Sequence, residues 1–163
     1  YTPWLNRNPA LCLVAPGVGF GTCMVLGTEV VLAGGASWTG FFASLIPFFQ
    51  VSNLLLLNQF PDIEADRAGG RRHVVITHGL RAGAVVYSLF SAAAFLSLAT
   101  GVLLGVLPPM VLIGLATAPL AALVSRNAFT YEEGSPTFVP SLAMNVAITL
   151  ATPLLVAAGL FLA

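Results

Sequence analysis

Two aspartates four residues apart carry the strongest chemical signal in the sequence. On a helical turn, Asp62 and Asp66 would project from one face, with their Cβ atoms about 5–6 Å apart. Carboxylates held that close repel each other unless a cation lies between them. Mg²⁺ suits such a pair, because in proteins it commonly joins one or two carboxylates to substrate phosphates. The spacing therefore predicts a magnesium site with Asp62 and Asp66 as the metal ligands.

Paired arginines follow the aspartates after a Gly-Gly break. Arg71 and Arg72 come within two helical turns of Asp66, and arginine is suited to bidentate contacts with phosphate oxygens. Asn58 lies one turn before Asp62 on the same face, where it could orient that carboxylate or take part in coordination. The order predicts a metal-diphosphate site in which the two aspartates are catalytic and the other three residues bind substrate.

A solvated surface loop is the plain alternative for this segment. Half of the chain's twelve charged residues lie between Asn58 and Gly79, and charged loops between apolar segments are common. Residue types and spacing alone leave both interpretations open. Glu64 is two residues from each aspartate and would face away from both on a helix, so we interpret it as a surface residue. His73 and His78 are interpreted as interfacial residues rather than bases.

The composition indicates which elements must position this segment. The chain is 58% apolar and only 7% charged, with a mean hydropathy of +0.95, whereas a soluble domain is about a quarter charged. A helix of about 20 mostly apolar residues spans a bilayer, and several such runs are present. The sequence therefore predicts an all-α, polytopic transmembrane helix bundle. The spacing of Cys12 and Cys23 suggests neither zinc nor haem, and both are interpreted as small apolar residues.

Five membrane spans are expected, at residues 10–32, 38–57, 82–104, 110–124 and 138–163. Residues 58–80 form a polar aspartate-rich loop between the second and third spans, and residues 125–136 form a second polar loop. Pro119 is expected to kink the fourth span.

Small and polar residues within the spans predict how the helices associate. Gly17, Gly19 and Gly21 in the first span would allow close helix approach. Three amides lie within apolar runs, where polar side chains tend to face the bundle interior: Gln50, Asn53 and Asn145.

Arginines predict the orientation in the membrane. Alternate loops fall on alternate sides, which puts all six on one side: Arg7, Arg67, Arg71, Arg72, Arg81 and Arg126. An excess of positive residues marks the cytoplasmic side. The aspartate-rich loop is therefore expected to face the cytoplasm.

The polar segment resembles the second aspartate-rich motif of the UbiA-type membrane prenyltransferases. That motif reads roughly N-x-x-x-D-x-x-x-D, a short spacer, then G-[KR]-[KR]-x-hydrophobic and a closing Gly. The positions are filled by Asn58, Asp62, Asp66, Gly70, Arg71, Arg72, Val74 and Gly79. Pro61 replaces a common Arg, and His73 replaces the usual Thr. Within the family, the segment is most similar to the 1,4-dihydroxy-2-naphthoate polyprenyltransferase branch.

This resemblance implies transfer of a polyprenyl group from a polyprenyl diphosphate to a small aromatic acceptor, as in menaquinone-type quinone biosynthesis. It implies Mg²⁺ as the cofactor, held by Asp62 and Asp66, and places Arg71 where a diphosphate-contacting Lys is usual. Membrane lipid would surround the spans, in the plasma membrane of a bacterium or archaeon. No nucleic-acid partner is expected.

A first aspartate-rich motif, which the family carries on an earlier helix pair, does not occur in this sequence, and the chain begins with Tyr1 rather than Met. Residues 1–163 are therefore expected to be a single membrane domain, the C-terminal five spans of a nine-span fold, and inactive alone. The alternatives are a non-catalytic membrane module and a prenyltransferase acting on 4-hydroxybenzoate or a glycerol-phosphate lipid. A cation transporter is disfavoured, because the carboxylates cluster at a helix end.

Overall fold

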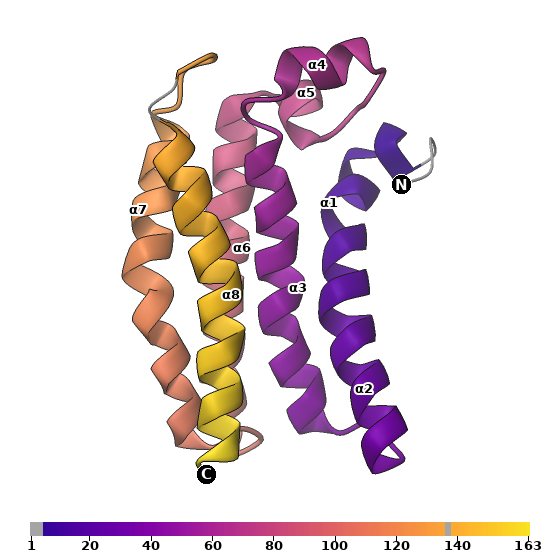
Figure 1. Cartoon of the computed structure of the whole chain (residues 1–163), viewed down its shortest axis with the longest axis vertical. Helices are drawn as coiled ribbons and strands as arrows, with labels where there is room; N and C mark the ends of the chain where they lie inside the picture. Colours follow the sequence, from indigo (N-terminus) through magenta and orange to yellow (C-terminus); the bar gives the residue numbers. More distant parts are fainter. Residues whose placement is uncertain (1–4, 136–137) are drawn as a thin grey trace.

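Five long apolar helical segments run side by side in the computed structural model, which describes residues 5–135 and 138–163 (Figure 1). Each is long and apolar enough to span a membrane: Pro9–Ala33, Trp38–Asn58, Leu80–Leu103, Pro109–Phe129 and Val139–Phe161. No strand occurs among the described residues. The all-α transmembrane bundle is confirmed, and the protein is an integral membrane protein.

The first span follows a short 3₁₀ turn, η1 (Leu5–Arg7), and has three parts: α1 (Pro9–Gly17), a π-helical segment η2 (Val18–Cys23) and α2 (Met24–Ala33). Within it, Gly17 and Gly21 lie against the backbone of α3 (Trp38–Asn58), so that a Cβ on either would clash with Phe48. Gly19 faces open space. The predicted close helix approach is therefore confirmed for Gly17 and Gly21. It is wrong for Gly19, because this residue lies on the other side of the helix.

Helix α3 is the centre of the bundle and packs against α1, η2, α6 (Leu80–Leu103) and α8 (Val139–Phe161). The side chain of Asn53 in α3 donates to the carbonyl of Tyr87 in α6 (2.9 Å), and the Tyr87 hydroxyl donates to Asn145 in α8 (2.8 Å). The Asn145 amide in turn donates to the Asn53 carbonyl (3.3 Å). Gln50 is buried as well. The predicted inward orientation of the three amides is confirmed.

The fourth span extends further than the sequence predicts. It begins as a 3₁₀ helix, η3 (Pro109–Thr117), and continues as α7 (Ala118–Phe129), with Pro119 in the first turn of α7. The expected end at residue 124 is wrong, because the polar residues that follow are held in the helix. Asn127 donates to the Ser141 hydroxyl of α8 (3.0 Å), and Ala128 is buried.

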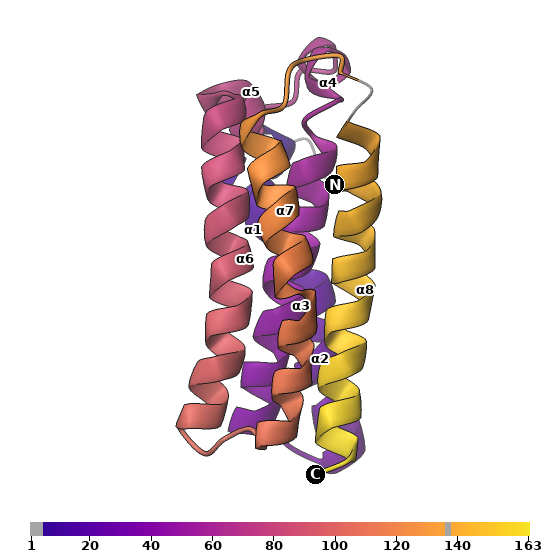
Figure 2. The same cartoon turned by 90° about the vertical axis from the view of Figure 1, so that its left-hand side faces the viewer.

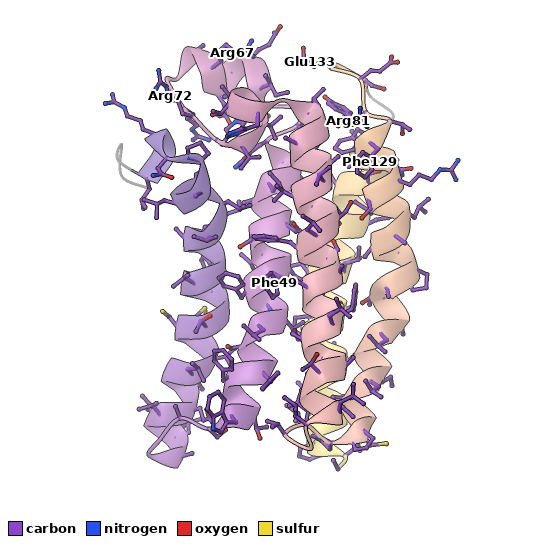
Figure 3. All side chains as sticks on the ribbon, turned by 180° about the vertical axis from the view of Figure 1, so that it is seen from behind. Phe49, Arg67, Arg72, Arg81, Phe129 and Glu133 are labelled. Atoms are coloured by element: carbon purple, nitrogen blue, oxygen red, sulfur yellow. The ribbon has the colours of Figure 1, made fainter. Side chains whose placement is uncertain are left out.

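Two short helices, α4 (Ile63–Ala68) and α5 (Val74–His78), cover one end of the bundle above α3 and α6 (Figures 1 and 2). They replace the expected loop at residues 58–80. Between them the chain turns at Gly70, which has a positive φ of 72°. Arg67, Arg72, Arg81 and Glu133 all lie at this end (Figure 3). The turn before α3 and the turn after α6 lie at the opposite end, as the arginine pattern predicts.

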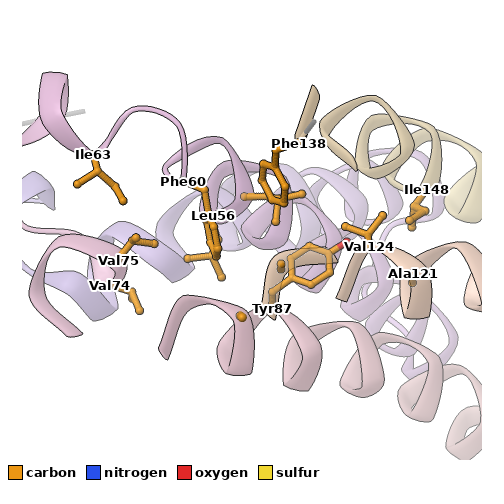
Figure 4. Close-up of a cluster of buried hydrophobic side chains, with 13 residues drawn as sticks. Leu56, Phe60, Ile63, Val74, Val75, Tyr87, Ala121, Val124, Phe138 and Ile148 are labelled. Atoms are coloured by element: carbon orange, nitrogen blue, oxygen red, sulfur yellow. The ribbon is translucent and has the colours of Figure 1, made fainter. Parts of the chain in front are cut away.

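A buried hydrophobic cluster anchors these short helices to the spans (Figure 4). Ile63 of α4 and Val75 of α5 are buried in it. Phe60 contacts Tyr131 and Phe138 from the α7–α8 connection, with ring centroids 5.7 and 5.6 Å away. The aspartate-bearing segment is therefore packed onto the bundle by side chains from both polar connections.

Candidate active site

A cavity of about 350 Å³ lies at the covered end of the bundle. Its lining comes from α1, the end of α3, the connection from α3 to α4, α4 itself and the linker to α5: Cys12, Leu55, Asn58, Gln59, Asp62, Asp66 and Arg71. Four of the five residues predicted from the sequence thus share one cavity. The fifth, Arg72, is exposed and does not line it.

One helical turn places the two aspartates together. The amide of Asp66 donates to the carbonyl of Asp62 at 2.8 Å, which is the i to i+4 bond that puts both side chains on one face. Asp62 precedes the first residue of α4 and is exposed, whereas Asp66 is only 9% exposed. Glu64 is exposed and lines a different cavity, beside Tyr131. Its interpretation as a surface residue agrees with this position.

Each oxygen of the Asp66 carboxylate has its own partner. Arg71 Nη1 lies 3.0 Å from Oδ1, and His73 Nε2 lies 3.1 Å from Oδ2. The two partners differ in their surroundings: the Arg71 side chain is 53% exposed, and the His73 side chain is 2% exposed. Asp66 is therefore held by one solvent-facing cation and one buried imidazole.

His73 is held at both ring nitrogens. It precedes α5 as its N-cap, where Nδ1 accepts from the Ile76 amide at 3.4 Å. Nδ1 therefore lacks a proton, which puts the proton on Nε2 and makes Nε2 the donor to Asp66. Burial lowers the pKa of His73, against the opposing effect of Asp66, so the imidazole is neutral at neutral pH.

The interpretation of His73 as an interfacial residue is wrong, because the residue is 1% exposed and bound to a predicted metal ligand. His78, in contrast, is exposed. The signal for His73 was local: a cap-forming position directly before an apolar run, in the segment that carries the aspartates. Cys12, Leu55 and Gln59 had no comparable signal, since they reach the cavity through the packing of α1 on α3.

The donor set fits Mg²⁺. Asn58, Asp62 and Asp66 offer hard oxygen atoms to one cavity, and these are the ligands that Mg²⁺ prefers. Among the residues that the structure describes, no group of three or more His, Cys, Asp or Glu side chains could hold a metal ion. The two carboxylates of the lining would hold only part of the shell of an ion, and substrate phosphate and water would complete it, as is common for Mg²⁺.

A comparison with known protein families gives a match over residues 1–146, to the UbiA prenyltransferase family. The chain belongs to this family. All lining residues of the cavity fall within the matched range, and membership implies transfer of a prenyl group from a diphosphate to an acceptor. No curated protein and no solved structure matches the chain.

Proposed function

We propose that this UbiA-family protein transfers a polyprenyl group from a polyprenyl diphosphate to a small aromatic acceptor. The observation that supports this most directly is the shared cavity: two carboxylates, two amides and a guanidinium lie at the polar end of a membrane bundle. Such a site can bind a charged diphosphate at the membrane surface while the prenyl chain extends along the apolar spans. The arginines at this end favour a cytoplasmic site in a bacterial or archaeal plasma membrane.

Asp62 and Asp66 would hold Mg²⁺, which when bound supplies positive charge to the departing diphosphate. Asp66 presents its carboxylate from a buried position, and Asp62 presents its own from the exposed start of α4. Arg71 can donate to phosphate oxygens, since its side chain is more than half exposed and lines the same cavity. These groups favour loss of diphosphate by stabilising the charge that develops on it.

Two assignments extend beyond the cavity lining. Asn58 is proposed to contact the substrate or to orient Asp62, because it lines the cavity from the last turn of α3. Arg72 stays a prediction as a second diphosphate contact, since its side chain would have to reach in from outside the lining.

The acceptor is proposed to be 1,4-dihydroxy-2-naphthoate, which would place the protein in menaquinone biosynthesis. The support is the sequence Asn58-Gln59-Phe60-Pro61-Asp62, which is similar to the start of the motif in that branch. An acceptor of another kind, 4-hydroxybenzoate or a glycerol-phosphate lipid, would use the same diphosphate site.

The test uses membranes containing the natural full-length protein, radiolabelled polyprenyl diphosphate and each of the three acceptors in turn. Prenylated dihydroxynaphthoate should form with Mg²⁺, disappear with EDTA and be lost in Asp62→Asn but not in Glu64→Gln. Product from another acceptor alone would replace the naphthoate assignment. Absence of product with all three would refute the proposed transfer to these acceptors and favour a non-catalytic membrane module.

A further inference from the structure

Asp66 is the more buried of the two acidic residues that line the cavity. Its two carboxylate oxygens have different partners, one buried and one largely exposed. The partner of Oδ2, His73, is buried and also caps α5. The partner of Oδ1, Arg71, is largely exposed, and its amide is separately fixed to the Asp66 carbonyl at 3.0 Å. The Arg71 side chain can therefore move while its backbone stays in place.

We propose that His73 is a positioning residue for the metal-binding carboxylate. Its Nε2–H fixes Asp66 Oδ2, which turns Oδ1 toward the cavity, and Arg71 occupies Oδ1 only until Mg²⁺ and diphosphate enter. Arg71 then exchanges its carboxylate partner for a phosphate oxygen. This inference rests on the proposed function and assigns a role to a residue that differs from the Thr usual at this position of the motif.

The two contacts of Asp66 differ in how much it costs to break them, and this difference supports the separate roles of Arg71 and His73. Arg71 loses little on leaving Asp66, because its side chain is more than half exposed and the guanidinium stays solvated in either position. Mg²⁺ would then supply the positive charge that the buried carboxylate loses. His73 cannot leave so easily. Its departure would unpair a buried carboxylate oxygen and remove the cap of α5 together.

A purely structural role, in which His73 only caps α5, is the competing explanation. Two substitutions of His73 separate the function of Nδ1, which caps α5, from that of Nε2, which contacts Asp66. His73→Asn keeps an acceptor near the Nδ1 position, where Asn is a favourable N-cap, but is too short to reach Asp66. His73→Gln places an amide N–H near the Nε2 position and loses the cap.

The experiment measures binding of radiolabelled inorganic pyrophosphate to the purified natural full-length protein in detergent, at increasing Mg²⁺ concentration. Wild type should bind pyrophosphate in a Mg²⁺-dependent way, and Asp66→Ala should weaken that dependence. Loss of a residue that hydrogen-bonds a metal ligand typically lowers metal affinity about 10–100-fold. His73→Asn should therefore raise the half-saturating Mg²⁺ concentration about tenfold or more, while His73→Gln stays within about threefold of wild type.

Thermal unfolding without Mg²⁺ supplies the control. If His73 only caps α5, the two variants should differ in stability alone, with His73→Gln the less stable one and both variants binding Mg²⁺ as wild type does. The positioning role would be overturned if the half-saturating Mg²⁺ concentration were unchanged in His73→Asn or rose strongly in His73→Gln. Either result would leave the proposed function standing. If His73→Asn fails to fold, His73→Ser, which also caps but cannot reach Asp66, takes its place.

The same titration separates this inference from the proposed function. If wild type binds no pyrophosphate with Mg²⁺, or if Asp66→Ala leaves the dependence unchanged, the metal assignment itself fails and the role of His73 fails with it.

Discussion

Asp66→Asn is the substitution that most directly tests the assigned metal site, because it keeps the shape of the side chain and removes its charge. The uncharged amide still offers one oxygen to His73 but can no longer form the ion pair with Arg71. Loss of a well-placed electrostatic contact commonly reduces turnover about 10²–10³-fold. An anionic metal ligand should contribute at least as much, which corresponds to about 3–4 kcal/mol of transition-state stabilisation.

The structural effect of the same substitution is much smaller. The ion pair involves an Arg71 side chain that is 53% exposed, so its loss should destabilise the protein by at most about 1 kcal/mol. The hydrogen bond from His73 is retained, because the amide oxygen can still accept it; only its full loss would leave the buried Nε2–H unpaired, at a cost of about 1–3 kcal/mol. Reduced turnover in Asp66→Asn can therefore be distinguished from unfolding.

Turnover against Mg²⁺ concentration, measured beside thermal unfolding of the same samples, separates these effects. Asp62→Asn should lose turnover to a similar extent with an even smaller loss of stability, because Asp62 is exposed. Glu64→Gln is the matched control, and its turnover should change by less than about tenfold, since Glu64 lies outside the cavity lining. Turnover in Asp66→Asn within tenfold of wild type at saturating Mg²⁺ would refute the assignment of Asp66 as a ligand.

Other parts of the structure give further expectations. Arg71→Ala should raise the apparent KM for the diphosphate donor, and Arg71→Lys should recover part of the loss, because charge remains but the forked geometry does not; an unchanged KM in Arg71→Ala would contradict the contact. Gly17→Ala should destabilise the bundle by about 1–3 kcal/mol in detergent through overpacking against α3, whereas Gly19→Ala should not; equal stability of the two would argue against the close helix approach. In a cysteine-free background, Ser37→Cys and Glu133→Cys should be labelled from opposite sides of the membrane, and labelling from one side would contradict the five-span arrangement.

The spans and four of the cavity residues could be predicted because their signals are local. Apolar length identifies a membrane helix, and a four-residue spacing within one turn fixes the relation between Asp62 and Asp66. The end of α7 could not be found in this way. Its last turn contains polar residues, and it stays helical because Asn127 finds a partner on α8.

The roles of the arginines and of His73 also depend on tertiary packing. Arg71 and Arg72 are adjacent and chemically identical, but only Arg71 lines the cavity, because the linker from α4 directs it toward Asp66. His73 is buried because α5 packs on the hydrophobic cluster through Val74 and Val75. Such distinctions follow from how short helices dock, which sequence periodicity does not specify.

The hydrogen bonds among Asn53, Tyr87 and Asn145 bear on how the protein is made. Asn145 belongs to α8, which is synthesised after α3 and α6, and its side-chain bonds go to those two helices. Each interhelical bond in a membrane contributes only about 0.6 kcal/mol on average, so the three cannot by themselves drive association. A shift of α8 along its axis by one helical turn, about 5.4 Å, would nevertheless break the two hydrogen bonds of the Asn145 side chain. Its amide would then face hydrocarbon. We therefore expect these side chains to favour the observed vertical alignment of α8 during biogenesis, among neighbours that offer it otherwise similar apolar surfaces.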